Sequence, residues 1–179
     1  VRIFGYLLTA RQEEGESCNC GLTDDGQPDQ DIAVNTDNHL VLVDDAGLKK
    51  GHLPNKANLD QWKTVLAKRE PSSITAEFTP RVRLSHPNFT RAAIKPLILD
   101  SRQTALPVRV TGMLMLDTEH LIRHHLHRAN NWEVHPILKL EYCEKGQTCT
   151  ADSDAGWKSL DDLTVPSPPA KTTRHAGGA

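Results

Sequence analysis

The amino-acid sequence predicts a mainly β fold, a five-stranded β-barrel with two or three short helices. Several segments alternate between apolar and polar residues, as half-buried strands do, and clusters of Gly, Asp and Asn separate them. The length of 179 residues, with 37% hydrophobic residues, suits one buried core better than two. We therefore expect one barrel domain over residues 1–149, followed by a short docking segment and a Pro- and Gly-rich tail over 150–179.

Five segments carry the strand pattern, and the second is the weakest. They cover residues 1–9, 31–34 together with 39–43, 74–83, 108–116 and 132–142. In the last two strands, the apolar positions expected to face the core are Val108, Val110, Leu114, Leu116, Trp132, Val134, Leu138, Leu140 and Tyr142. Pro80 indicates a bulge or an edge in the third strand, because proline lacks the N–H that a strand ladder needs. Gly112 indicates a bulge in the fourth strand.

Helices are expected at three places. The first covers about 58–70, begins at an Asn58 cap and is inserted between the second and third strands. The second covers 89–95 after an Asn88 cap, between the third and fourth strands. A third, over 157–163, would dock near the end of the chain. A helix between the third and fourth of five strands is the order of the OB (oligonucleotide/oligosaccharide-binding) barrel, so we predict an OB-type fold.

Five short segments carry a resemblance to known proteins. They are ESCNC at 16–20, EFTPR at 77–81, VRVTG at 108–112, LDTEH at 116–120 and WEVHP at 132–136. These segments resemble a group of uncharacterised bacterial OB-fold-like β-barrel proteins, and the resemblance covers most of residues 1–142. It implies the fold and implies no activity, because OB barrels serve many unrelated functions.

The cysteines predict disulfide bonds. Cys18, Cys20, Cys143 and Cys149 are even in number and lie in polar surroundings, whereas free cysteines are usually buried among apolar residues. A bond between Cys143 and Cys149 would close a short ring. Disulfides indicate an oxidising compartment, so a secreted or periplasmic protein is expected; four free thiols are the alternative. No run approaches 18 apolar residues, so no membrane-spanning helix is predicted.

A candidate ligand-binding face follows from the predicted fold. In OB barrels, the loops between strands one and two and between strands four and five flank the usual binding face. Here those loops, 11–31 and 117–131, are the segments richest in Cys, Asp, His and Arg. The residues expected on the face between them are His39, Thr75, Glu77, Arg81, Glu133 and His135. The ligand would be a protein, a saccharide or a nucleic acid; an ordinary solvated sheet face is the alternative.

The second hypothesis is a metal-binding protein or metalloenzyme that uses the Cys18/Cys20 loop and the cluster of histidines from His120 to His135. His120 and His124 would share one face of a helix, and with Cys18 and Cys20 they could hold zinc or another transition metal. No HExxH pattern is present, and Cys-x-Cys is a poorer zinc motif than Cys-x-x-Cys. Solvated loop histidines are the alternative, and no cofactor is then expected.

Further alternatives are a Ca²⁺-dependent nuclease and a nucleic-acid-binding protein. The nuclease interpretation rests on acidic side chains that could hold Ca²⁺ and arginines that could grip phosphate. These residues are Asp24, Asp25, Asp29, Asp31, Arg81 and Arg83. Aromatic residues make up only 4% and the net charge is −2, which disfavours a nucleic-acid binder. Since no motif of a known catalytic class occurs, the sequence favours a non-catalytic binding or structural module, with self-assembly through edge strands left open.

Overall fold

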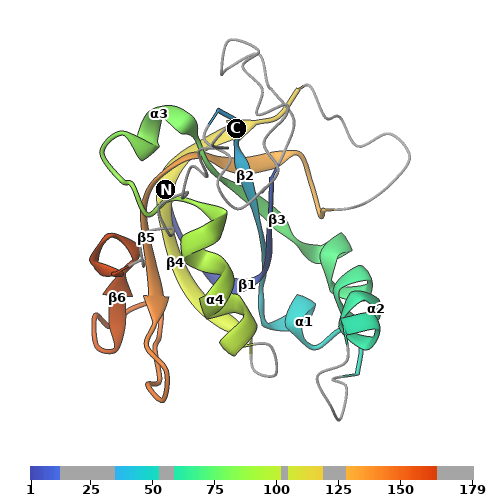
Figure 1. The fold of residues 1–179 in the computed structure, drawn as a ribbon. Coiled ribbons are helices and arrows are strands. Elements are labelled where there is room, and N and C mark those ends of the chain that lie inside the picture. Colours follow the sequence, from blue (N-terminus) through green and yellow to red (C-terminus); the bar gives the residue numbers. More distant parts are fainter. Residues whose placement is uncertain (13–34, 53–58, 102–104, 119–127, 165–179) are drawn as a thin grey trace, which may run out of the picture.

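The computed structural model describes residues 1–12, 35–52, 59–101, 105–118 and 128–164 (Figure 1). Within them the chain is mainly β, with short helices between the strands. The elements are β1 (Arg2–Gln12), β2 (Asn38–Val43), α1 (Asp45–Leu48), α2 (Leu59–Arg69), the 3-10 turn η3 (Glu70–Ser72), β3 (Ile74–Phe78), α3 (Pro80–Arg83), α4 (Arg91–Asp100), β4 (Leu106–Leu116), β5 (Trp132–Cys143), β6 (Trp157–Ser159) and the 3-10 turn η4 (Leu160–Asp162).

Five of these strands close into a barrel. β1 pairs antiparallel with β2 and with β4, β2 with β3, and β4 with β5. A parallel pairing of β3 with β5, through Thr75 opposite Glu133, closes the ring. Because α3 and α4 lie between β3 and β4, the order is that of an OB-type barrel, and the predicted fold class is confirmed.

The segment after the barrel differs from the expected helix over 157–163. Trp157–Ser159 forms β6, which pairs antiparallel with the end of β5, and only one 3-10 turn follows. Trp157 is buried and packs edge-on against Phe4, so it fills one face of a strand. Figure 1 shows β6 on one side of the barrel and α2 on the opposite side. The predicted bond between Cys143 and Cys149 is present and ties the end of β5 to the loop before β6.

The core fills the inside of the barrel with aliphatic side chains and a stacked pair of phenylalanines. Phe78 and Phe89 are fully buried, with ring centroids 4.8 Å apart. Helix α4 contributes the buried Ala93 and Ile94. Its cap is Thr90, whose hydroxyl accepts a hydrogen bond from the backbone N–H of Ala93, so the helix begins two residues later than an Asn88 cap would give.

Gly112 is at a bulge, as predicted, and the bulge shifts the register of β4 against β5. A Cβ on Gly112 would lie 2.4 Å from the carbonyl oxygen of Pro136, so only glycine fits there. Beyond this irregularity the inward positions no longer follow a strict alternation. Ile137 fills the core, whereas Leu138 is 48% exposed, which contradicts the inward position predicted for Leu138.

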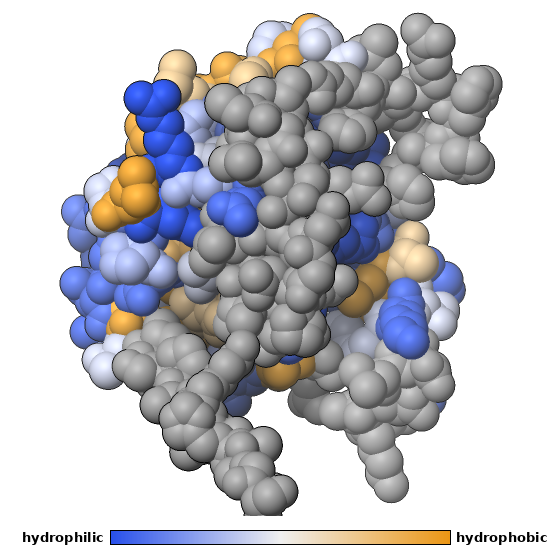
Figure 2. Space-filling view, turned by 45° about the horizontal axis from the view of Figure 1, so that its top comes forward, coloured by the Kyte–Doolittle hydropathy of each residue, from blue (hydrophilic) through white to orange (hydrophobic). Residues whose placement is uncertain are grey.

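The exposure of side chains at the end of β4 and at the start of β5 also differs from the prediction. Leu114, Leu116 and Trp132 were expected to face the core, but each is nearly half exposed because this end of the two strands extends past the packed interior. Where the face shown in Figure 2 is not grey, hydrophobic residues form separate patches among hydrophilic ones. Within the described residues, no helix is long and apolar enough to cross a membrane.

The third strand is shorter than the predicted 74–83. It ends at Phe78, and Pro80 begins α3, because proline cannot continue a ladder but suits the first turn of a helix. Arg83 then fixes this corner through three backbone carbonyls. Its side chain donates to Thr36 and Phe89, both at 2.8 Å, and to Phe78 at 3.1 Å. The guanidinium therefore holds this corner of the fold together.

Candidate metal centre

Polar side chains gather on the outer side of the barrel wall formed by β2, β3 and β5. Glu77 lies opposite His39 in the β2–β3 pairing, and Thr75 lies opposite Glu133 in the β3–β5 pairing. Their chain neighbours face the barrel core, so these residues face outward, as does His135, which like Glu133 is next to the core residue Val134. Glu77 is nevertheless only 1% exposed, Glu133 2% and His135 7%. This face is therefore a buried polar layer, and it is not the solvated surface of the alternative interpretation.

At the middle of this layer are Asp37, Glu77 and His135, which we call the carboxylate–histidine centre. Each offers one ligand atom, and these atoms all lie within 4.8 Å of one another. The Nε2 atom of His135 is 3.9 Å from Asp37 Oδ2, and its Nδ1 atom is 3.3 Å from Glu77 Oε2. The other oxygen of Glu77, Oε1, is 2.6 Å from His39 Nε2. Asp37 immediately precedes β2, so three separate segments build the centre.

A second group of charged residues supports the centre from β5 and the segment before it. Glu133 Oε1 lies 3.3 Å from His135 Nδ1, within hydrogen-bond distance. The guanidinium of Arg128 contacts Glu133 Oε2 at 3.2 Å and also binds Asp117. In the neutral tautomer that carries its proton on Nδ1, His135 donates to a carboxylate through Nδ1 and keeps the lone pair of Nε2 for a ligand.

The electrostatics of the centre favour an added positive charge. Burial raises the pKa of Glu77 to about 7, and His39 and His135 only partly oppose this. Burial alone would lower the pKa of His135, but the hydrogen bond to Glu133 and the negative charge of Glu77 and Asp37 raise it overall. Each group thus holds its proton more tightly than usual, as expected where carboxylates are crowded together in a poorly hydrated place.

Within the described residues, negative groups outnumber positive ones in this layer. The carboxylates are those of Asp37, Glu77, Glu133 and Asp117, and the permanent cation is Arg128. Glu77 Oε2 is also buried without a hydrogen-bond partner among these residues. Carboxylate oxygen together with imidazole nitrogen is a donor set for borderline divalent ions such as Zn²⁺, Mn²⁺ and Fe²⁺. Three protein ligands also leave coordination positions for water or a substrate.

The structure brings four of the predicted face residues together, namely His39, Glu77, Glu133 and His135, and places Thr75 beside them. Arg81 does not join them. It is exposed on α3, since the strand that should have carried it ends before Pro80. The predicted metal ligands and the other two predicted disulfide cysteines, which are Cys18, Cys20, His120 and His124, lie outside the described residues, as do the acidic residues of the nuclease interpretation.

Sequence reasoning missed Asp37, Arg128 and Asp117. Asp37 falls in the gap between the two parts of the second predicted strand, 31–34 and 39–43, although it stands two residues before His39, the spacing at which residues of an extended chain share one side. That spacing was the available signal. Comparisons of the chain with protein-family models, with curated proteins and with solved structures find no match.

Proposed function

We propose that this protein is a metal-binding OB-type barrel module whose carboxylate–histidine centre holds one divalent transition-metal ion. The observation that carries the proposal is the buried convergence of Asp37, Glu77 and His135, with one ligand atom of each within 4.8 Å of the others. A buried carboxylate oxygen of Glu77 without a hydrogen-bond partner among the described residues points to the same conclusion. A charge so poorly compensated is costly unless a cation joins it.

Each residue has a distinct role in this proposal. Asp37 and Glu77 supply anionic oxygen ligands, and His135 supplies Nε2. Glu133 is a positioning residue, because its carboxylate fixes the tautomer and the ring orientation of His135. His39, 2.6 Å from Glu77 Oε1, holds the Glu77 carboxylate in place from the other side. Since β2, β3 and β5 are paired strands of a closed barrel, the ligands are held in a preformed arrangement.

The compartment in which the protein works and the partner that it binds are also part of the proposal. The Cys143–Cys149 bond supports a module that works in an oxidising compartment, secreted or periplasmic. The centre lies on the β2–β3 face that OB barrels use for ligands, so a protein, saccharide or nucleic-acid partner would approach the bound metal there.

Metal titration of the full chain tests the proposal. After treatment with a chelator and gel filtration, calorimetric titration with Zn²⁺ or Mn²⁺ should give about one site per chain, and elemental analysis should give the same ratio. Glu77→Gln and His135→Ala should each abolish this site. Glu144→Gln, which changes an exposed carboxylate on the loop after β5, should leave it unchanged.

A different result would give the centre another role. If wild-type protein takes up neither metal, while Glu77→Gln raises the unfolding temperature at neutral pH, then protons alone neutralise the centre and the metal proposal is wrong. Equal uptake by wild type and Glu77→Gln would also reject it, since the metal would then bind elsewhere.

A further inference from the structure

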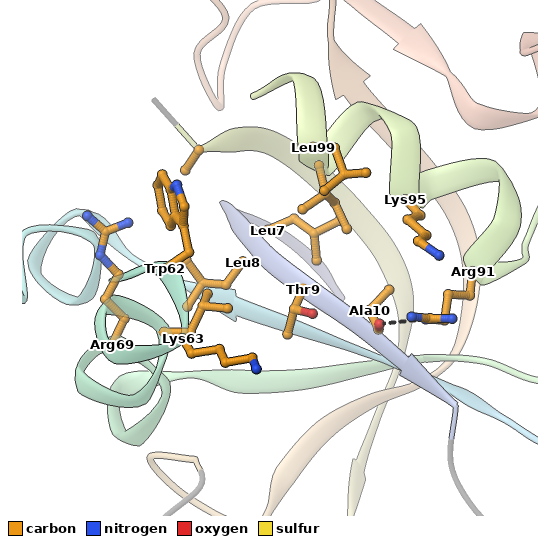
Figure 3. Close-up of a pocket in the computed structure, with 13 residues that line it drawn as sticks. Leu7, Leu8, Thr9, Ala10, Trp62, Lys63, Arg69, Arg91, Lys95 and Leu99 are labelled. Atoms are coloured by element: carbon orange, nitrogen blue, oxygen red, sulfur yellow. Dashed lines mark hydrogen bonds between the residues drawn. The ribbon is translucent and has the colours of Figure 1, made fainter. Parts of the chain in front are cut away.

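A cavity of about 200 Å³ lies between β1, α2 and α4, and it shares no lining residue with the carboxylate–histidine centre (Figure 3). Its floor is β1, where a register shift against β2 falls at consecutive leucines, Leu7 and Leu8. Leu66 of α2 and Ile98 and Leu99 of α4 complete the apolar part. The cavity is thus a gap between two helices that both pack over the same strand.

Two buried side chains of α2 that line this cavity, Trp62 and Arg69, carry donors that the described residues do not fully satisfy. The indole Nε1–H of Trp62 is buried and has no hydrogen-bond partner among the described residues, although Trp62 is only 5% exposed. Arg69 is 3% exposed, and its guanidinium makes one hydrogen bond, from Nε to the carbonyl of Lys50 at 3.0 Å. No carboxylate of the described residues lies within ion-pair distance of Arg69, and burial lowers its pKa. In Figure 3 both side chains rise from α2 on the same side.

The remaining charged side chains that line the cavity are also cationic. Lys63 comes from α2, and Arg91 and Lys95 come from α4, on the other side of β1 (Figure 3). Arg91 is fixed by a hydrogen bond from its Nε to the carbonyl of Ala10 at 3.1 Å. Among the described residues that line the cavity, none is acidic. An apolar floor with cationic edges and buried donors is complementary to a molecule that has an apolar body and one negative group.

We propose that this cavity binds a small amphipathic carboxylate, with its carboxylate group accepting hydrogen bonds from Arg69 and from Trp62 Nε1 and its apolar part lying on Leu7, Leu8 and Leu99. A dry cavity of about 150 Å³ accommodates benzene, so about 200 Å³ suits roughly ten non-hydrogen atoms. An eight-carbon fatty acid and a phenyl-substituted propionate both have this size. Both molecules carry the carboxylate group that Arg69 and Trp62 would bind, and they differ in the shape of the apolar part.

Titration with octanoate, 3-phenylpropionate and neutral octanol tests this proposal on the full chain. Both carboxylates should bind, and octanol should bind at least about tenfold more weakly, because it cannot satisfy a buried cation. The ratio of the two carboxylate affinities shows whether a chain or a ring is preferred. In spectra of ¹⁵N-labelled protein, the indole N–H resonance of Trp62 should move downfield as the bond forms. Trp157 provides an internal control, since its Nε1 already donates to the carbonyl of Thr150.

Variants locate the site. Arg69→Met keeps an unbranched apolar stem and removes the guanidinium with its charge, so octanoate affinity should fall at least about tenfold. Its fold should persist, because the native guanidinium has no counter-ion among the described residues. Trp62→Phe should remove the shifted resonance and weaken binding severalfold. Arg81→Met changes an exposed arginine of α3 outside the cavity and should have no effect. Equal affinity for octanol and octanoate, or an unchanged Trp62 resonance at saturating octanoate, would overturn the proposal.

Discussion

Strand β5 contributes one buried carboxylate to each of two clusters whose electrostatic environments are opposite. Near its start, Glu133 belongs to the layer around the carboxylate–histidine centre. Near its end, Glu141 faces Arg109 of β4, which grips both of its oxygens at 2.9 and 3.1 Å. Arg109 also donates to Asp154 at 2.9 Å and lies over the ring of Trp157, 4.7 Å from its centroid. Every strong donor of this second cluster, which we call the Arg109 cluster, faces an acceptor or an aromatic ring.

The pKa shifts express the same contrast. Burial would raise the pKa of Glu141, but hydrogen bonds from Arg109 and Lys139 outweigh it and lower the pKa. Burial raises the pKa of Glu77 to about 7, and its histidine neighbours do not reverse the shift. One barrel wall therefore holds a carboxylate stabilised as an anion and another that favours its protonated form. We infer that the balanced cluster serves the fold and the unbalanced centre serves a ligand.

The largest expected effect comes from breaking the balanced cluster. Arg109→Met leaves Glu141 buried without its cation, and removal of one partner of a buried pair costs about 3–5 kcal/mol of unfolding free energy. Urea denaturation at neutral pH measures the loss. Lys139→Met is the matched control, because Lys139 contacts the same carboxylate at 3.0 Å from an exposed position and should cost less than about 1 kcal/mol. Equal losses in the two variants would show that the pair is not the stabilising element.

The second-largest expected effect is the pH dependence of the unfolding free energy of the metal-free protein. The folded-state pKa of Glu77, about 7, exceeds the usual 4.5, so between these values the native state binds more protons than the unfolded state. Stability therefore falls as the pH rises from about 4.5 to about 7. His135, whose pKa is also raised, acts in the same direction, since its contribution is present below pH 6.5 and is lost as the pH rises through its folded-state pKa.

Urea denaturation in the presence of a chelator at pH 5 and pH 8 measures this effect. The expected loss is about 2–3 kcal/mol, from roughly two pKa units at one site. Glu77→Gln should remove most of it and should be the more stable protein at pH 8. A wild-type protein that is equally stable at both values would contradict the unbalanced charge of the centre.

Removal of the carboxylate that supports His135 should have a somewhat smaller effect, which is measured as a loss of metal affinity. Glu133→Gln keeps the shape of the side chain but removes the anion that holds the Nδ1 proton of His135 and pairs with Arg128. Loss of such a support typically weakens metal binding by about 10–100-fold. Calorimetric titration with Zn²⁺ measures the change, and Glu141→Gln is the control on the same strand. If Glu141→Gln weakened metal binding equally, the two clusters would not be independent.

Part of this contrast could be predicted from the sequence. Alternation in β3 predicted that Glu77 faces away from the core, and the predicted face included His39, Glu133 and His135, which the structure brings together with Glu77. Alternation shows which side of a strand a residue takes, however, and it does not show what covers that side, so the burial of Glu77 and His135 was not predicted. The parallel pairing of β3 with β5 joins segments far apart in the chain. That pairing, and not any local motif, brings Glu77 beside His135.

Other features depend on tertiary structure in the same way. The bulge at Gly112 was predicted, but the resulting exchange of Leu138 for Ile137 in the core depends on how closely β4 approaches Pro136. The cavity lined by Trp62 and Arg69 exists because α2 and α4 pack over one strand from two sides, which no periodicity reveals. Asp37 belongs to an extended chain that leads into a strand, and its residue type alone favours a turn.

The smallest expected effect concerns the outer edge of the Arg109 cluster. Asp154 is 2.9 Å from Arg109 Nη1, and this contact lowers its pKa, but its side chain is 92% exposed. Water can replace such a partner, so Asp154→Asn should leave the unfolding free energy unchanged within the error of urea denaturation. The comparison with Arg109→Met is then direct, since one variant removes a solvated contact and the other a buried charge. A loss for Asp154→Asn as large as that for Arg109→Met would mean that the number of contacts, and not their burial, decides which cluster stabilises the fold.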